Sequence, residues 1–201
     1  MSTSTTNPDA HRLLDFWFDD AYPITRRFAA DPALDADLRT RFGSLVASAR
    51  TPALDSWQSH PHSTLALILL LDQLPRNIHR DTPDAFSSDA KALSVTTTAI
   101  AKGFDKQVPL NQQAFFYLPL VHTETLLGQI AGKAQLEVWE MRCVQDEKVR
   151  EFASKGVVMA QKHMDVIMMF GRYPSRNEAR GWESTEEEKE FLRENPTGFV
   201  R

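Results

Sequence analysis

The feature that most constrains the fold of this chain is an apolar run that turns abruptly polar. Residues 65–71 read LALILLL, and a run of seven apolar side chains must be covered on every side because it has no polar face to turn toward water. The residues that follow, DQLPRNIHRD, carry acid, amide, imidazole and guanidinium groups. Buried polar groups are costly unless they are paired, so this junction is either a structural hydrogen-bond network or the floor of a site.

We assign the apolar run to a helix rather than a strand. Periodicity alone does not separate a buried strand from a buried helix in so short a run. However, no partner strand is evident elsewhere in the chain, and Asp72 and Gln73 extend the run without a turn signal. Pro75 is expected to kink or end this helix, because proline lacks a backbone donor and clashes with the preceding turn.

Helix boundaries recur along the rest of the chain. Asn7 and Asp31 each precede a proline, as an N-cap precedes proline at the first helical position. Thr185 opens a helix with acids in its first turn, and Gly171 ends a long apolar stripe. These signals and the apolar stripes predict helices that begin near residues 8, 32, 52, 65, 89, 111, 132, 149 and 185, with residues 60–63 as a connector.

The sequence therefore predicts an all-α fold of about nine or ten helices, many of them in hairpin-like pairs, as in a tetratricopeptide-like array. No repeat of fixed period is found, so a true repeat protein is not demonstrated. A length of 201 residues suits one compact domain. We expect a disordered tail over residues 1–7, a single all-helical domain over residues 8–194, and a second tail over residues 195–201.

Composition narrows the function classes. The formal net charge of −4 gives no global attraction to nucleic acid, although a local basic patch is compatible with it. The single cysteine, Cys143, excludes an internal disulfide framework and a multi-cysteine zinc site, and its place on an apolar stripe predicts a buried, inert thiol. The start of the sequence lacks an apolar signal core, and no apolar run is long enough to span a membrane. We expect a cytoplasmic protein with no membrane or DNA partner and no cofactor or metal.

The first group of candidate site residues follows the apolar run. Asp72 and Arg76 are four residues apart with the acid first, which favours an ion pair if the helix continues past Pro75. Two interpretations stay open: a buried polar knot that fixes the kink, or a site wall whose arginines bind phosphate or carboxylate. The substrate-binding candidates here are Asp72, Gln73, Arg76, Asn77 and Arg80.

A second group lies in FFYLPLVHTE, residues 115–124. On a continuous helix Tyr117 and Glu124 would share a face and His122 would lie on the adjoining one. Glu124 would then be a general base or bind a cation, and Tyr117 and His122 would relay protons. A zinc deaminase is excluded because its signature needs a cysteine pair. The alternative for His122 is a core histidine with its hydrogen bonds satisfied.

A third group lies around the end of the long helix predicted over residues 149–170. His163 flanks its apolar stripe and is a candidate base. Arg172, Arg176 and Asn177 follow it as candidate substrate-binding residues. With Arg76 and Arg80, these arginines would form a basic patch for phosphates, whereas the alternative is an ordinary solvated face.

At these three groups the sequence resembles a known family. The stretches LLDQLPRNIHRDTPDAFSSD, FFYLPLVHTE and KHMDVIMMFGRYPSRN resemble the signatures of the domain of unknown function 924 (DUF924) family, in order along the chain. The resemblance covers residues 10–192 and implies an all-helical, tetratricopeptide-like fold. Some fungal proteins associated with this family are arginine-containing cyclodipeptide synthases, and the Ser/Thr-rich start of this chain is similar in style to fungal sequences.

By that resemblance the protein would take arginine from arginyl-tRNA, join it to a second amino acid and close a diketopiperazine ring. No catalytic residue of the family carries over as established. The chemistry would need an acid for the arginine guanidinium, a base for the attacking amine and cations for the tRNA acceptor end. The candidates for the acid are Asp72 or Glu124, and those for the base are His122, Glu124 or His163. The candidate cations are Arg76, Arg80, Arg172 and Arg176. A covalent intermediate would also need a nucleophile, for which the candidates are Ser87, Ser88 or Tyr117.

Two other functions stay open. One is a helical scaffold that grips a peptide or protein in a concave groove. The other is an enzyme that binds a different small anionic substrate through the same arginines. The discriminating observation is spatial: convergence on one pocket indicates a site, whereas scatter favours the scaffold. The residues to compare are Asp72, Arg76, Glu124, His163 and Arg172.

Overall fold

The structure is a computed structural model that describes residues 7–20 and 27–195. Over those residues every regular element is a helix or a helical turn, with no β-strand, so the predicted all-helical fold and its ten or so helices are confirmed. Of the tails predicted over residues 1–7 and 195–201, all but residues 7 and 195 lie outside the described residues. In the part of the chain that the structure describes, no helix is both long and apolar enough to cross a membrane.

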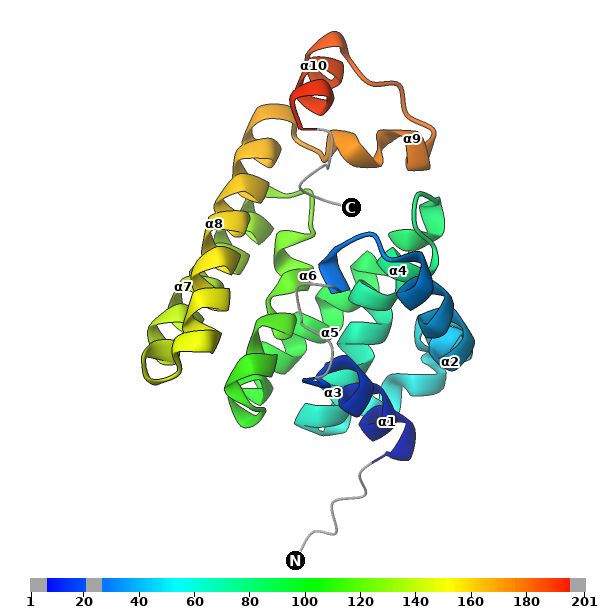
Figure 1. Cartoon of the computed structure of the whole chain (residues 1–201), viewed down its shortest axis with the longest axis vertical. Helices are drawn as coiled ribbons and strands as arrows, with labels where there is room; N and C mark the ends of the chain where they lie inside the picture. Colours follow the sequence, from blue (N-terminus) through cyan, green and yellow to red (C-terminus); the bar gives the residue numbers. More distant parts are fainter. Residues whose placement is uncertain (1–6, 21–26, 196–201) are drawn as a thin grey trace, which may run out of the picture.

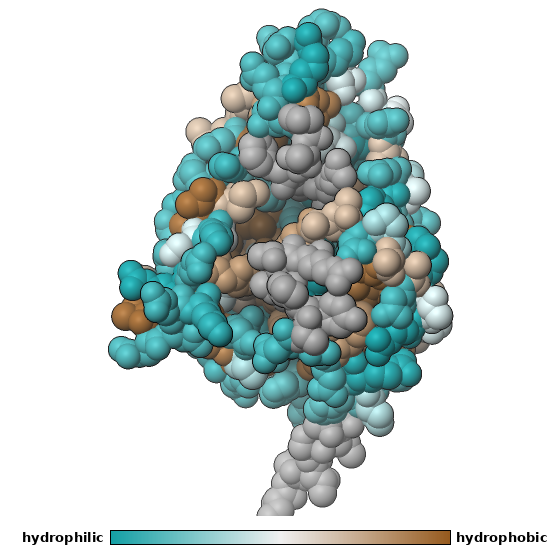
Figure 2. Space-filling model, in the orientation of Figure 1, coloured by the Kyte–Doolittle hydropathy of each residue, from teal (hydrophilic) through white to brown (hydrophobic). Residues whose placement is uncertain are grey.

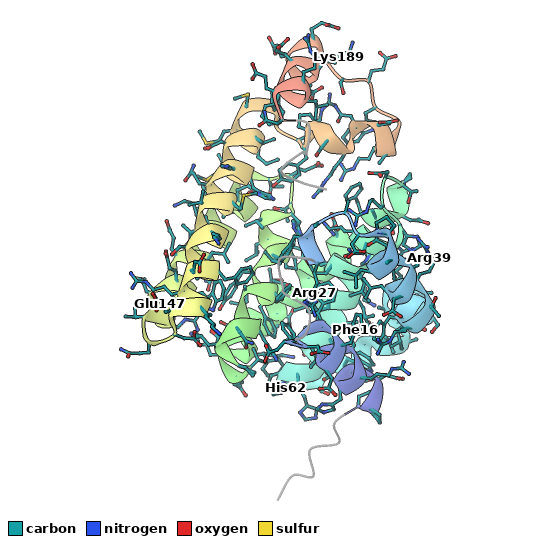
Figure 3. All side chains as sticks on the ribbon, in the orientation of Figure 1. Phe16, Arg27, Arg39, His62, Glu147 and Lys189 are labelled. Atoms are coloured by element: carbon teal, nitrogen blue, oxygen red, sulfur yellow. The ribbon has the colours of Figure 1, made fainter. Side chains whose placement is uncertain are left out.

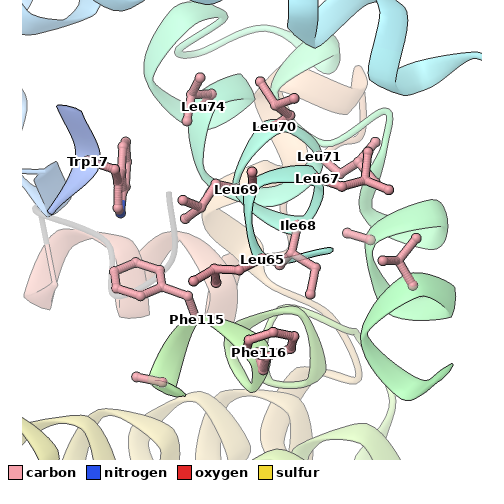
Figure 4. Close-up of a cluster of buried hydrophobic side chains, with 14 of the residues drawn as sticks. Trp17, Leu65, Leu67, Ile68, Leu69, Leu70, Leu71, Leu74, Phe115 and Phe116 are labelled. Carbon is pink, nitrogen blue, oxygen red and sulfur yellow. The ribbon is translucent and has the colours of Figure 1, made fainter. Parts of the chain in front are cut away.

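The apolar run lies at the centre of the core, as predicted. It belongs to α3 (Pro61–Ile68) and to the wide π-helical turn Leu69–Gln73 that follows it. All seven side chains of residues 65–71 are fully buried. Figure 4 shows them between Trp17 on one side and Phe115 and Phe116 on another. Burial of each leucine or isoleucine side chain of this run contributes on the order of 1.5–3 kcal/mol, so the run is the main apolar anchor of the fold.

Pro75 does not end the helix. The chain passes through the π-helical turn into α4 (Leu74–Ile78), and this wide turn accommodates the proline ring. Because Pro75 has no N–H, the carbonyl of Leu71 four residues earlier lacks its helical partner. The Ser88 hydroxyl donates to that carbonyl instead, at 2.8 Å. Asp72 and Arg76 therefore stay on successive turns of one helical path.

The N-terminal helices pack against this centre and begin as predicted. Asn7 and Asp31 cap α1 (Pro8–Trp17) and α2 (Pro32–Arg50) with their side-chain oxygens. A 3₁₀ segment, Pro52–Ser59, leads into α3. The prediction that residues 60–63 form a connector is wrong, because α3 already begins at Pro61. Proline at the first helical position starts the helix there.

The remaining elements form the rest of one all-helical fold. Figure 1 shows α7 and α8 side by side along one edge of the molecule, with α9 and α10 at the end where α8 stops. Gly171 ends α8 in the left-handed conformation, and Thr185 caps α10 in a capping box, both as predicted. The bounds of the helices are α5 (Asp89–Ala101), α6 (Leu118–Val121), α7 (Leu126–Arg142), α8 (Glu147–Phe170), α9 (Asn177–Arg180) and α10 (Glu186–Glu194), with 3₁₀ segments at Pro83–Ala85, Phe104–Gln107, Leu110–Phe116, Cys143–Gln145 and Pro174–Arg176.

The prediction of one helix over residues 111–126 is wrong. A 3₁₀ segment runs to Phe116, α6 restarts with Pro119 in its first turn, and a turn separates α6 from α7. The Thr125 hydroxyl caps α7 at the N–H of Gly128, so α7 also begins earlier than the predicted residue 132. As a result Tyr117 and Glu124 do not share a helical face, and His122 lies in the turn between α6 and α7.

Cys143 is fully buried, as predicted, and its thiol donates to the carbonyl of Trp139 at 3.1 Å. Burial raises the pKa of this thiol. A buried thiol with a raised pKa carries little thiolate, which agrees with an inert side chain.

Two helical glycines give opposite expectations for substitution by alanine. A Cβ atom at Gly132 would lie 2.6 Å from Cγ1 and 3.0 Å from the backbone nitrogen of Val121, so Gly132 is required for the contact of α7 with α6. A Cβ atom at Gly156 in α8 would meet nothing within 4 Å. We expect Gly132→Ala to lower the free energy of unfolding by about 1–3 kcal/mol, and Gly156→Ala to raise it by about 0.5–1 kcal/mol. Urea unfolding of both variants tests this, and a neutral Gly132→Ala would contradict it.

Candidate functional site

Side chains from all three groups of candidate residues meet in one network of ion pairs and hydrogen bonds. Asp72 contributes from the π-helical turn, Arg76 from α4 and Asp89 from the first turn of α5. The turn between α6 and α7 and the segment after α8 supply the other members. We call this set the central network, and it consists of Asp72, Arg76, Asp89, His122, Glu124 and Arg176.

Arg76 joins the buried Asp72 to the partly exposed Asp89. Its guanidinium makes a bidentate pair with Asp89, at 3.0 and 3.1 Å, and Nη1 also donates to the backbone oxygen of Asp72 at 2.5 Å. The carboxylate of Asp72 lies 3.4 Å from the same nitrogen. Bidentate pairs of this kind combine charge with fixed geometry. Burial lowers the pKa of Arg76, but the carboxylates of Asp72 and Asp89 outweigh it and raise that pKa overall.

Asp72 orients His122. The Oδ1 atom of Asp72 lies 2.7 Å from Nδ1 of His122, and Gln73 donates to Oδ2 at 2.6 Å. Burial raises the pKa of Asp72, but the neighbouring His122 and Arg76 outweigh it and hold that pKa well below its usual range. An ionised carboxylate only accepts hydrogen bonds, so Nδ1 of His122 carries the proton and Nε2 is left with a lone pair.

The environment keeps His122 neutral. Burial and the nearby Arg76 lower its pKa, against the opposing effect of Asp72. His163 on α8 lies next to it, with the ring centroids 6.3 Å apart. Nδ1 of His163 lies 2.7 Å from the carbonyl of Met159. Burial, together with the neighbouring His122, lowers the pKa of His163 to about 3. Two neutral imidazoles therefore lie beside each other at neutral pH.

Arg176 is almost fully buried between two aromatic rings. Its guanidinium carbon lies 4.6 Å from the ring centre of Tyr173 and 4.7 Å from that of Phe86. Nη1 donates to the carbonyl of His122 at 3.1 Å and lies 3.4 Å from Asp89. Burial and the neighbouring Arg76 lower the pKa of Arg176 to about 10. Because that value is far above neutrality, Arg176 is a buried cation.

Glu124 ties the turn after α6 to the segment that follows α8. Its carboxylate accepts from the N–H of Tyr173 at 3.1 Å and from Arg180 at 2.6 Å, and it lies 3.8 Å from Arg176. The Tyr173 hydroxyl donates to the carbonyl of Val121 at 2.5 Å. The resulting charges balance, because the three carboxylates meet three guanidinium groups: Asp72, Asp89 and Glu124 against Arg76, Arg176 and Arg180.

Some buried donors in this region have no hydrogen-bond partner among the described residues. They are Nε of Arg76 and both Nε and Nη2 of Arg176. Unsatisfied buried donors are costly, and they are more common at sites than in ordinary cores. The location and the positive charge of these donors indicate capacity for an additional acceptor, such as a phosphate or carboxylate oxygen.

A pocket of about 290 Å³ opens beside the network, and Arg76 belongs to both. Its lining residues come from α4, the segment around Phe86 and the segment after α8: Arg76, Arg80, Asp81, Ala85, Phe86, Ser175, Glu178 and Ala179. A larger and more open hollow of about 610 Å³ lies between α1 and α2, away from every candidate site residue. Figure 2 shows a further hollow beside α8, with apolar side chains in its visible part.

Several candidate residues lie outside the central network. The Tyr117 hydroxyl donates to Asp105 at 2.7 Å and accepts from Arg142. Asn77 and Arg80 both bind Asp35, although Arg80 also lines the pocket. A further pair, Arg172 and Asn177, binds Glu188 of α10. Figure 3 shows this outer end of the molecule at Lys189, also on α10.

The sequence interpretation missed Asp89, Phe86 and Tyr173. Asp89 looked like an ordinary acid in the first turn of a helix, yet it neutralises both Arg76 and Arg176. The sequence did contain one indication of its role, because two arginines near the end of a buried helix need carboxylate partners. No group of three or more His, Cys, Asp or Glu side chains among residues 7–20 and 27–195 is arranged to hold a metal ion.

Comparisons with known proteins agree with the fold. The model of a family described as "Bacterial protein of unknown function (DUF924)" matches residues 13–196. A solved structure, described as a protein of unknown function, ATU0120, from Agrobacterium tumefaciens, superposes with a TM-score of 0.78 at 32% identity, over 92% of this chain and 97% of that one. A search of curated proteins found no match. Neither description states an activity.

Removal of the Asp89 carboxylate, which pairs with two buried arginines, tests the charge balance. Asp89→Asn leaves Arg76 and Arg176 without their shared partner, so we expect a loss of about 3–5 kcal/mol in the free energy of unfolding. Asp37→Asn is the matched control, because Asp37 pairs with Arg41 at 3.4 Å on the exposed surface and should cost less than about 1 kcal/mol. Equal effects in urea unfolding would contradict the buried network.

The lowered pKa of His163 predicts how stability depends on pH. Between the ordinary histidine value of 6.5 and about 3, the unfolded chain binds a proton at this residue that the folded chain does not. Stability therefore falls as pH falls through this interval, by up to about 1.4 kcal/mol per pH unit from this residue. We expect His163→Gln to reduce the slope of unfolding free energy against pH in this interval. An unchanged slope in His163→Gln would refute the assignment.

Proposed function

The chain belongs to the DUF924 family of bacterial proteins of unknown function, and on this premise we propose that it is an enzyme whose general base is His122. The reaction we propose is tRNA-dependent synthesis of a cyclic dipeptide that contains arginine. The observation that carries the proposal is the buried pair of Asp72 and His122, with 2.7 Å between the carboxylate oxygen and Nδ1. A carboxylate that holds one imidazole nitrogen leaves the other with a lone pair to accept a proton.

A neutral base suits an amine nucleophile. At neutral pH the lowered pKa of His122 keeps its Nε2 unprotonated, so it can take a proton from the attacking amine. His163 lies on the adjacent side of the ring and would orient the base or pass the proton on. The charges of the central network are fixed by ion pairs, so little reorganisation is needed as charge develops.

The proposed reaction joins two aminoacyl groups. The amine of one aminoacyl ester attacks the carbonyl carbon of the other, a C–N bond forms and the C–O bond to the tRNA ribose breaks. His122 takes the proton of the amine and returns it to the departing ribose oxygen. The second amine then attacks the remaining ester carbonyl in the same way, which closes the diketopiperazine ring and releases the second ribose.

The arginine substrate would bind through a carboxylate. Asp72 is held by Arg76 and His122 in the interior. Glu124 is the better candidate, because its partner Arg180 is partly exposed and could be replaced by the guanidinium of the substrate. The phosphates of the acceptor end would lie at Arg76 and Arg80, which line the pocket. A phosphate oxygen there would accept a hydrogen bond from Nε of Arg76, which has no partner among the described residues.

A second candidate is an enzyme on another small phosphate or carboxylate. The observation that favours it is the pocket of about 290 Å³, which suits a small ligand better than a tRNA end. A helical binding scaffold has less support. That interpretation predicts dispersed polar groups, whereas Asp72, Arg76, Glu124 and His163 come together. Arg172 stands apart with Glu188.

The direct test supplies purified protein with arginyl-tRNA and each second aminoacyl-tRNA in turn. We expect a cyclic dipeptide that contains arginine, detected by mass spectrometry. Absence of product with all second amino acids would refute the synthase. Isothermal titration calorimetry with inorganic phosphate tests the second candidate, an enzyme on a small anion. That candidate requires the protein to bind phosphate and Arg76→Gln to abolish the binding.

Substitution of the base gives a sharper prediction. We expect His122→Asn to lower the rate of product formation by at least about 100-fold, as expected when a general base is removed. His62→Gln, on the exposed surface, should leave the rate unchanged. Circular dichroism is used to check that both variants are folded. Full activity in a folded His122→Asn would show that another group is the base.

A further inference from the structure

The outward face of α7 is apolar along its whole length. Leu127 is 78% exposed and Met141 is 66% exposed, while Ile130 and Val138 between them are 52% and 43% exposed. Ala134, at the centre, is also exposed. These residues are separated by three, four, four and three positions, so they form one stripe on the helix. The opposite face of α7 is buried, and it includes Gln129, Gly132, Leu136 and Trp139.

This stripe is not explained by the fold or by the central network. A surface helix normally turns polar side chains to water and keeps one apolar face for the core. In α7 the buried face already packs in the protein, and Figure 1 shows the helix at the edge of the molecule beside α8. The second apolar face extends over about 21 Å, and a continuous exposed patch of this kind marks an interaction surface.

The order of side chains along the stripe is symmetric about Ala134. Leu127 and Met141 lie seven positions before and after it, and Ile130 and Val138 lie four positions before and after it. We propose that this face binds a second copy of the chain, through an antiparallel pair of α7 helices with the twofold axis at Ala134. A twofold interface must be complementary to itself, and this order places large apolar side chains opposite one another.

The centre of the stripe suits such a crossing. Each pair across the interface joins Leu127 to Met141 of the other copy and Ile130 to Val138 of the other copy, while the two Ala134 residues meet on the axis. A small residue at the crossing point lets two helices approach closely, because their separation depends on the side chains at the contact. The large residues then interlock on both sides of the alanines.

The charges at the edge of the stripe favour a second copy over a charged partner. Lys133 and Glu137 form an ion pair within α7, so each copy neutralises its own charge at the rim. The interior of the stripe carries no charged side chain. An apolar centre with a neutral polar rim is the usual composition of an interface between identical chains.

The area of the stripe indicates how strongly two copies should associate. Two such faces would bury about 1,000 Å² in total, at the lower limit of specific interfaces. We therefore expect a dimer that dissociates on dilution in the micromolar range. The central network faces away from α7's outer stripe, because Gln129 on the buried face donates to Tyr173 and to the carbonyl of Val121. Each copy would keep its own site.

Sedimentation equilibrium of the full chain, from low micromolar to several hundred micromolar, tests the proposal. We expect a monomer–dimer equilibrium that Ile130→Lys shifts to monomer at all these concentrations. Val158→Lys on α8 is the matched control, because Val158 is 56% exposed outside the stripe, and it should leave the equilibrium unchanged. A wild-type chain that stays monomeric, or a dimer that survives Ile130→Lys, would overturn the proposal.

A charge exchange tests the register. Ile130 lies across from Val138 of the other copy, so Ile130→Lys combined with Val138→Glu should restore dimers through two new ion pairs. Ile130→Lys combined with Val138→Lys should remain monomeric. The two double variants have the same number of exposed substitutions, and circular dichroism is used to check that both are folded. Equal behaviour of the two would contradict the antiparallel register about Ala134.

Discussion

The pairing of buried charges at the end of the apolar helix is the interaction on which the rest of the structure depends. Arg76 and Arg176 are both nearly inaccessible to solvent, and Asp89 neutralises both. An unpaired charge in that position would cost several kcal/mol, so the chain segments that carry these groups are held in place together. The π-helical turn before Pro75 makes this possible, because it keeps Asp72 within reach of Arg76. The apolar run supplies the burial, and the polar residues that follow it supply the specificity.

Capping signals predicted many helix starts, whereas apolar periodicity alone mispredicted the segment after Asn111. Asn7, Asp31 and Thr185 cap helices as their sequence context indicates, because capping needs only neighbours in the chain. The segment from Asn111 to Leu126 was predicted as one helix, yet Pro119 and the hydroxyl of Thr125 divide it. Apolar periodicity alone does not register such breaks.

The candidate site shows the same division. Asp72, His122 and Arg176 were candidates because each belongs to a group of polar residues beside an apolar stretch, and the structure brings them together. Tyr117 and Asn77 looked equally suitable, but Asp105 and Asp35 hold them elsewhere. Those partners lie far along the sequence or in unremarkable contexts, so no local pattern announced them. The same applies to Asp89, whose importance follows only from the second arginine that reaches it. Sequence chemistry thus indicated which segments matter, and topology decided which residues meet.

The proposed activity depends on the protonation state of the His122 imidazole. If Asp72 holds His122 as a general base, His122 is neutral at pH 7 and carries its proton on Nδ1, with Nε2 unprotonated. Histidine nitrogen chemical shifts in a ¹⁵N-labelled protein, recorded from neutral to acid pH, measure both properties directly. We predict the Nδ1–H tautomer for His122 and a pKa below the ordinary histidine value. A protonated His122 at pH 7, or a proton on Nε2, would contradict the assignment of His122 as the base.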